Sequence, residues 1–301
     1  MTPPDARKAT VLGLLAVLLW AGLAALTAAV GAVPPFQLAA MTFAIGTLVG
    51  LCWIRLKGES LGVLTRVPLA SWCLGVYGLL AFHVCYFYAL QAAPPLEASL
   101  IIYLWPLLIV LFVALLPARA GGRSLKWWHV AGALLGLTGT ILILLGGTGR
   151  IELGGAASGY VAAVAAALIW SSYSVLSRLL ASVSSTAVIG SCAATAIGAA
   201  LLHFGLETTV LPTTIGAWLA IIALGIGPVG LAFYLWDEGM KRGDIRLLGV
   251  ASYSTPLLST LLLAALGLGE ATRTIWVAAL FISAGALLAS RDSLLRGQSA
   301  D

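Results

Sequence analysis

Apolar runs of about twenty residues follow one another along nearly the whole chain, and they constrain its fold more than any other feature. Only 9% of the 301 residues are charged, whereas soluble domains carry roughly 25%. A chain with so few charges cannot cover its surface for water. It can cover it for lipid, because apolar helices satisfy their own backbone hydrogen bonds inside a bilayer. We therefore predict an all-α integral membrane protein.

Charges, prolines and glycines divide the apolar runs into ten candidate transmembrane helices. Their predicted ranges are 9–29, 34–54, 68–91, 95–116, 127–146, 155–180, 185–204, 213–238, 245–267 and 274–290. The first range has some features of a signal peptide, but it has a counterpart in the second half, so we interpret it as the first helix. The short connections leave no room for a soluble domain.

The distribution of Lys and Arg predicts the orientation in the membrane. With a cytoplasmic N-terminus, only Arg150 and Arg273 of the 16 basic residues fall outside. The other 14, on the cytoplasmic side, are Arg7, Lys8, Arg55, Lys57, Arg66, Arg119, Arg123, Lys126, Arg178, Lys241, Arg242, Arg246, Arg291 and Arg296. Cytoplasmic loops retain positive charge. We expect a multi-pass protein of the inner (plasma) membrane with both termini cytoplasmic, and this bias explains the pI of about 9.2 without a nucleic-acid partner.

An internal repeat appears when the chain is shifted by 150 residues. The coinciding pairs are Trp20 with Trp170, Gly75 with Gly225, Tyr103 with Tyr253 and Pro106 with Pro256. Each half would hold five helices, an odd number, so the halves must lie in the membrane with opposite orientations. We therefore predict two inverted repeats, residues 1–150 and 151–301, in one membrane domain. Inverted repeats underlie many secondary transporters, with the substrate held near the midplane.

Short motifs in both halves resemble those of a known superfamily. The second half has Gly239-Met240-Lys241-Arg242-Gly243-Asp244, Tyr253-Ser254-Thr255-Pro256 and Leu266-Gly267-Leu268-Gly269-Glu270, and the first has Tyr103-Leu104-Trp105-Pro106. They resemble the EamA-type repeats of the drug/metabolite transporter (DMT) superfamily, although Leu116-Pro117 replaces the Gly-Glu in the first half. Within it, the aromatic-rich first half is most similar to the YddG-type aromatic amino-acid exporters. The resemblance implies the ten-helix DMT fold and amino-acid export.

Ionisable residues are predicted to lie at helix ends or in loops, including Lys241 and Arg242 at the cytoplasmic surface. Without basic groups in the interior, a phosphorylated substrate is not expected. Without a buried carboxylate, tight proton coupling is not expected either, which favours a passive or weakly coupled carrier. His83 is the one titratable residue expected near midplane depth. Either it couples protons, because its imidazole titrates near physiological pH, or it is a neutral hydrogen-bonding side chain.

Aromatic residues with polar atoms predict a substrate site in the interior. The predicted lining is Trp20, His83, Tyr86, Tyr103, Trp170 and Tyr253, with Trp105 as a further member that would point away from Tyr103 on an unkinked helix. Aromatic faces attract an ammonium group by about 2 kcal/mol when desolvated, and hydroxyls can bind a carboxylate. We therefore expect amino acids or related metabolites as substrates, with Pro106 and Pro256 as hinges for alternating access.

Other functions stay open at this point. The same aromatic site would serve the efflux of organic-cation drugs or xenobiotics, and a non-transporting scaffold or receptor is a further alternative. An intramembrane enzyme is the least favoured, because no catalytic constellation is evident. We expect no cofactor and no metal site. The sequence does not decide the substrate order, the coupling ion, the direction of transport or the oligomeric state, for which a monomer is favoured.

Overall fold

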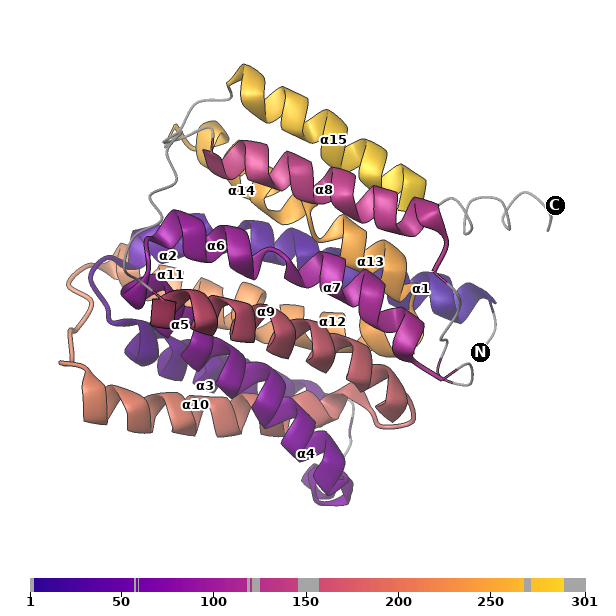
Figure 1. Ribbon diagram of the computed structural model, residues 1–301. Coiled ribbons are helices and arrows are strands. Elements are labelled where there is room, and N and C mark those ends of the chain that lie inside the picture. The colour runs from indigo at the N-terminus through magenta and orange to yellow at the C-terminus, as the bar shows by residue number, and fades with distance from the viewer. Residues whose placement is uncertain are drawn as a thin grey trace.

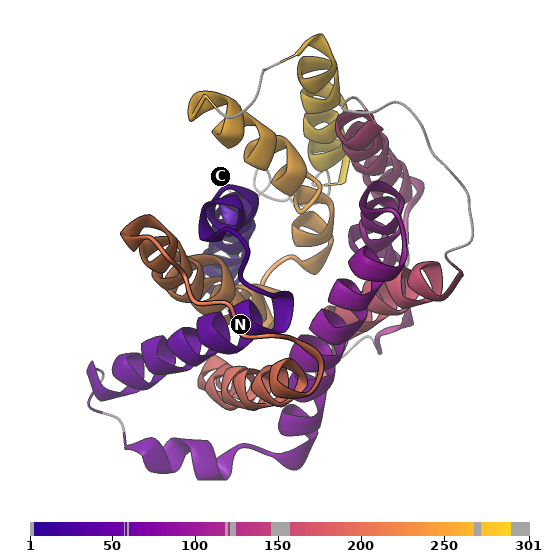
Figure 2. The ribbon, with the colours of Figure 1, turned by 90° about the vertical axis from the view of Figure 1, so that its left-hand side faces the viewer.

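The computed structural model describes residues 3–56, 58, 60–117, 120, 125–145, 157–267 and 272–289. These residues form helices and connections without a strand, and the helices run along a common direction (Figures 1 and 2). Six helical runs are long and apolar enough to cross a membrane, and one bent pair would make a seventh. The predicted repeat boundary at residue 150 and the Gly-Glu motif at Glu270 lie outside the described residues.

The helical elements of the first half follow the predicted ranges closely. They are α1 (Pro3–Ala21), α2 (Leu23–Val30), α3 (Pro35–Leu56), η1 (Leu61–Arg66), α4 (Leu69–Val76), η2 (Tyr77–Ala81), α5 (Phe82–Ala92), α6 (Pro95–Ile102), α7 (Trp105–Phe112), η3 (Val113–Leu115) and α8 (Trp127–Leu145). Prolines begin three of these helices, Pro3 in α1, Pro35 in α3 and Pro95 in α6. The first helical position suits proline, because its missing N–H would have no partner in the helix.

The second half repeats this pattern of elements. It contains α9 (Ala157–Leu176), η5 (Ser177–Leu180), η6 (Ser185–Ala187), α10 (Val188–Leu206), α11 (Ile215–Ile226), η7 (Gly227–Leu231), α12 (Ala232–Arg242), α13 (Ile245–Ala251), α14 (Ser254–Ala265) and α15 (Arg273–Ala289). Asp244 caps α13, since its carboxylate accepts hydrogen bonds from the backbone N–H groups of Arg246 and Leu247 at 3.2 and 3.1 Å.

Two irregularities recur at the same spacing in both halves. Five-residue π-helical turns, η2 and η7, interrupt otherwise continuous helices at residues 77–81 and 227–231. Turns also separate α6 from α7 at Tyr103 and α13 from α14 at Tyr253, and the latter pair is bent by 40°. The π-helical turns are 150 residues apart, the offset at which the sequence repeats, and the helix breaks, at residues 103–104 and 252–253, are 149 apart.

Helices of one half pack mainly against helices of the other. The most extensive contacts are α8 with α15, α1 with α12, α3 with α10 and α5 with α9. Glycines permit the closest of these contacts: a Cβ on Gly132 would lie 2.6 Å from the carbonyl oxygen of Gly285, and a Cβ on Gly285 would lie 2.5 Å from that of Gly132. Small residues have this role in membrane helix packing generally.

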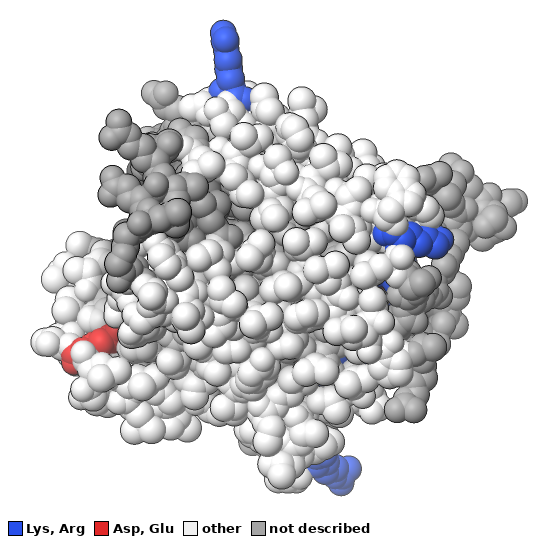
Figure 3. All heavy atoms as spheres, viewed as in Figure 1, with Lys and Arg blue, Asp and Glu red and all other residues white. Residues whose placement is uncertain are grey.

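The outer surface of the bundle is apolar. Leu18, Leu48, Val161, Leu201 and Leu280 are each more than half exposed. In the space-filling view, the charged side chains lie at the ends and edges of the face, and its middle carries none among the residues drawn as described (Figure 3). A surface of this kind is suited to lipid and unsuited to water.

Candidate substrate site

Rings from both halves meet in the interior of the bundle. We call the following residues the aromatic cluster: Trp20, Phe43, Phe82, His83, Tyr86, Trp105, Trp170, Tyr173, Phe233 and Trp236, whose neighbouring ring centroids are 5.0–6.3 Å apart. They come from α1, α3, α5, α7, α9 and α12. Such separations are those of aromatic pairs in contact.

Three tryptophans form the centre of the cluster. Trp20 lies 5.7 Å from Trp170 and 5.0 Å from Trp236, and the last two stack at 6.3 Å with an interplanar angle of 19°. The indole N–H of Trp20 donates to the carbonyl of Pro228 in η7, at 3.0 Å. That of Trp236 donates to Ser174 Oγ at 3.1 Å. These bonds fix two of the three rings, so their faces are held in place for a ligand.

His83 lies in the first turn of α5, and its ring has a defined orientation. Its Nδ1 lies 2.7 Å from the carbonyl oxygen of Leu79 in η2. Because a carbonyl only accepts, Nδ1 carries the proton, and in the neutral ring Nε2 is left as an acceptor. The ring stands edge-on to Phe43 at 5.0 Å. The half-buried imidazole therefore offers Nε2 to a ligand, since no described residue bonds to this atom.

Tyr86 brings a hydroxyl group into the aromatic cluster, and Tyr103, at the break between α6 and α7, lies near Tyr86 but outside the ring contacts that define the cluster. Both side chains are half-buried, and they are close enough to interact electrostatically. Within the described part of the chain, neither hydroxyl has a hydrogen-bond partner. A phenol in this state can donate to a carboxylate or accept from an ammonium group.

Trp105 belongs to the aromatic cluster, as the sequence-based prediction included it. It lies 6.3 Å from Trp170 and 5.9 Å from Trp236, inside the cluster. The prediction that it points away from Tyr103 assumed an unkinked helix. The chain makes a turn at Tyr103 and Leu104, directly before Trp105, so this assumption does not hold.

Tyr253 lies apart from the aromatic cluster. It is fully buried in a second core between α7, α8 and α15, and its hydroxyl accepts a hydrogen bond from the backbone N–H of Leu107 at 3.1 Å. That N–H belongs to the first turn of α7, where it has no helical partner. Tyr253 thus stabilises the start of α7. The two proposed hinge residues, Pro106 and Pro256, are buried in the first turns of α7 and α14, directly after the helix breaks.

Five members of the cluster were not identified from the sequence. These are Phe43, Phe82, Tyr173, Phe233 and Trp236. The repeat offset could have found two of them, because Phe233 corresponds to His83 and Trp236 to Tyr86. The other three have no aromatic counterpart at that offset.

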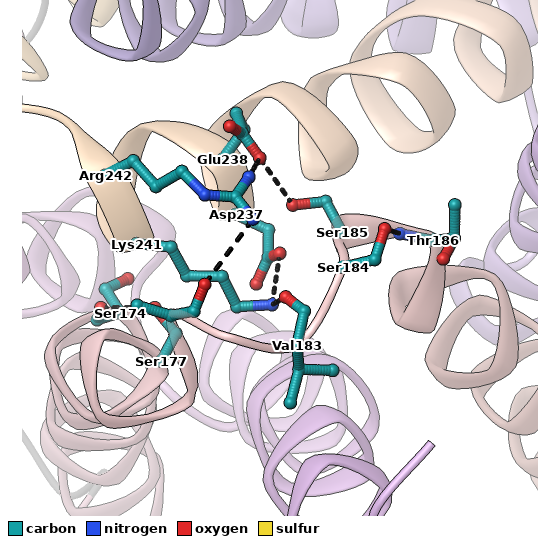
Figure 4. A network of polar contacts seen from close by, with 11 residues as sticks. Ser174, Ser177, Val183, Ser184, Ser185, Thr186, Asp237, Glu238, Lys241 and Arg242 are labelled. Carbon is teal, nitrogen blue, oxygen red and sulfur yellow. Dashed lines mark hydrogen bonds and ion pairs between the residues drawn. The ribbon is translucent and has the colours of Figure 1, made fainter. Parts of the chain in front are cut away.

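Lys241 lies in the last turn of α12, as predicted, but it is buried in an ion pair and not exposed at the surface. Lys241 Nζ lies 2.7 Å from Asp237 Oδ2, with side chains only 3% and 5% exposed. Lys241 also donates to the carbonyl of Val183 at 3.1 Å (Figure 4). Beside the pair is a cavity of about 10 Å³, room for one water, which is also lined by Tyr173 of the aromatic cluster.

Further polar contacts join the end of α12 to the segment 178–187. Arg178 donates to the carbonyls of Met240 at 3.0 Å and Gly243 at 2.7 Å. Glu238 pairs with Arg242 and accepts a hydrogen bond from Ser185 at 3.1 Å (Figure 4). The two segments are held together at this end of the bundle, next to the site.

Comparisons with known proteins agree with this architecture. The sequence profile of the EamA-like transporter family matches residues 7–145 and again 157–291. The aromatic amino acid exporter YddG of Ancylobacter novellus is 50% identical over 284 residues, which cover 94% of this chain and 97% of that protein. Exporters of the same name from Salmonella typhimurium and Escherichia coli are 27% and 28% identical, again over 94% of this chain and 96% of theirs. A solved crystal structure with 50% identity superposes with a TM-score of 0.88, covering 94% of this chain and 97% of its own. The chain therefore belongs to the EamA-like transporter family.

Proposed function

We propose that this protein exports amino acids, aromatic ones included, across the inner membrane by alternating access. The observation that carries the proposal is the aromatic cluster, in which Trp20 and Trp170 meet at 5.7 Å from corresponding positions of the two halves. The relatives named as aromatic amino acid exporters support it, because they match nearly the whole chain.

The proposed architecture is ten spans in two inverted repeats, residues 1–150 and 151–301. Support comes from the π-helical turns, which recur 150 residues apart, and from the helix breaks, which recur 149 residues apart. The helix contacts add to it: exchanging the halves converts the α1–α12 contact into the α9–α5 contact and leaves the α3–α10 and α8–α15 contacts unchanged. A two-fold axis in the membrane plane would produce this pattern.

The proposed orientation places both termini in the cytoplasm. Of the described basic residues, Arg273 lies at one end of the bundle, and nine lie at the other. The nine are Arg7, Lys8, Arg55, Arg66, Lys126, Arg178, Lys241, Arg242 and Arg246. The remaining basic residues of the prediction, Lys57, Arg119, Arg123, Arg150, Arg291 and Arg296, lie outside the described residues.

The chemistry of the cluster suits a zwitterion with an aromatic side chain. Indole faces at the centre can stack on the side chain and attract the ammonium group. The free hydroxyls of Tyr86 and Tyr103 can bind the carboxylate. Because the rings now touch one another, the substrate must part them, and the helix break beside Trp105 gives that ring a place to pivot.

Efflux of organic cations is the second candidate function. The cluster has aromatic faces and no Lys or Arg side chain, which would also suit a cation without a carboxylate. A substrate panel separates the two, because only an amino-acid carrier needs the hydroxyls for a carboxylate.

Efflux from proteoliposomes tests the proposal. Vesicles would be loaded with radiolabelled phenylalanine, leucine or tetraphenylphosphonium, and efflux followed with and without a pH gradient. We expect protein-dependent phenylalanine efflux that is insensitive to the gradient and that Trp20→Ala and Tyr103→Ala reduce severalfold. If wild-type efflux instead depends on the gradient and His83→Ala removes that dependence, His83 couples protons; otherwise it is a neutral hydrogen-bonding side chain.

Trp53→Ala is the matched control. Trp53 is 57% exposed at the end of α3, away from the cluster, so its loss should leave efflux unchanged. Efflux of tetraphenylphosphonium without any amino acid would refute the proposal and favour the second candidate.

A further inference from the structure

A second cavity opens at the end of the bundle where α1 begins and α12 ends. Its volume is about 420 Å³, within the usual range of small-molecule sites. Its lining is Asp5, Lys8, Ala9, Leu12, Glu238 and Arg242. Leu12 is eight residues before Trp20 on α1, about 12 Å along the helix, so the cavity is separate from the aromatic cluster. We call it the vestibule.

The vestibule has charges of both signs on facing helices. Asp5 and Lys8 come from α1, and Glu238 and Arg242 come from α12. Among the described residues, Lys8 has no ion-pair or hydrogen-bond partner, and its side chain is exposed. The Glu238–Arg242 pair is 24% and 29% exposed, and ion pairs this accessible are weak enough to exchange partners.

This arrangement matches a zwitterion. The α-carboxylate of an amino acid can pair with the Lys8 ammonium and the Arg242 guanidinium. Its α-ammonium group can pair with a carboxylate of the same wall. Ala9 and Leu12 provide apolar contact for a side chain. An amine or a carboxylic acid alone would satisfy only half of these groups.

We propose that the vestibule is a second substrate site, at which a zwitterionic amino acid docks before it reaches the aromatic cluster. The inference rests on the proposed function and deepens it. Glu238 also accepts from Ser185, and Arg242 also reaches the carbonyl of Ala181 at 3.4 Å. A docked zwitterion competes for both side chains, and this competition loosens the contact between α12 and the segment 178–187.

Thiol protection tests the vestibule directly. In a variant whose four cysteines, Cys52, Cys73, Cys85 and Cys192, are replaced by serine, Leu12→Cys puts one thiol in its wall. Its labelling by a membrane-impermeant maleimide is followed in everted vesicles, where the cytoplasmic face is outward. Phenylalanine should slow labelling severalfold, whereas phenethylamine and 3-phenylpropionate at the same concentration should not.

Two further variants identify the cause of the protection. Lys8→Gln should abolish it, while Arg55→Gln, a basic residue outside the vestibule, should leave it intact. Protection should also persist with Trp170→Ala, because the docking site does not need the aromatic cluster. The proposal is overturned if the thiol reacts equally fast with and without phenylalanine, or if protection survives Lys8→Gln and disappears with Trp170→Ala.

Failure of the proposed function would give a different result. Phenylalanine efflux by the cysteine-free protein is measured in parallel. Efflux without protection refutes the vestibule alone, whereas protection without efflux supports the vestibule and refutes export.

Discussion

Breaking the buried ion pair between Asp237 and Lys241 should strongly destabilise the protein. Lys241→Met removes the ammonium group 2.7 Å from Asp237 Oδ2 and leaves that carboxylate buried, at 5% exposure. Removing one partner of a buried pair costs about 3–5 kcal/mol, because the other charge stays desolvated. Replacing both partners by apolar residues removes that penalty, so Asp237→Leu together with Lys241→Met should recover most of the loss.

The adjacent pair provides an internal control. Glu238 and Arg242 have the same spacing on the same helix, but their side chains are 24% and 29% exposed. Arg242→Met should therefore cost less than about 1 kcal/mol. Because the two pairs differ mainly in exposure, a difference between the two losses of stability is caused by burial.

Thermal unfolding in one detergent at one scan rate, followed by circular dichroism, measures these effects. At about 2–4 °C per kcal/mol, Lys241→Met should lower Tm by about 6–20 °C. The reasoning fails if the double variant loses as much as the two single variants together, since the charges would then be energetically independent. It also fails if Lys241→Met and Arg242→Met have equal effects.

Three further predictions concern other contacts. Tyr253→Phe removes the acceptor of the Leu107 N–H and should lower the free energy of unfolding by about 1–3 kcal/mol, measured by thermal unfolding. Tyr103→Phe should lower it by less than about 0.5 kcal/mol, and equal losses of stability would contradict the assigned roles. Gly78→Ala places a Cβ 2.2 Å from the Tyr173 ring and should destabilise by about 1–3 kcal/mol and slow efflux. Gly205→Ala, with nothing within 4 Å, should stabilise by up to about 1 kcal/mol, and the opposite order would refute the packing argument. Glu207→Gln weakens a carboxylate that accepts from Phe36 N and Gln37 N, so hydrogen exchange at the start of α3 should accelerate while the start of α10 is unaffected.

The sequence predicted the helices well, because each is marked by the length of its apolar run. The range 34–54, for example, became Pro35–Leu56. Trp20 and Trp170, which meet in the aromatic cluster, could be predicted as interior residues because they lie midway along predicted spans and recur at the repeat offset. These features are local or periodic, so they can be read without knowing which helices touch.

Other features depend on tertiary structure and could not be read in this way. Lys241 stands at a helix end, where a basic residue normally faces water, and it is buried because the segment 178–187 covers it. Tyr253 lies in one helix break and Trp105 directly follows the other, so face assignments made for straight helices do not apply to them. Trp236 precedes four charged residues within six positions and therefore looks like part of an interfacial segment.

The π-helical turns have a consequence for exchanging segments between related carriers. Each turn adds one residue to its helix, and one residue corresponds to about 100° of rotation. In the helix formed by α4, η2 and α5, the turn sets the angle between Leu74, which lines the small cavity, and Tyr86, which faces the aromatic cluster. A chimera joined within residues 77–81 would change this angle even if every side chain were kept. Junctions between homologous carriers should therefore be placed in the connections, with each turn transferred together with both of its flanking helices.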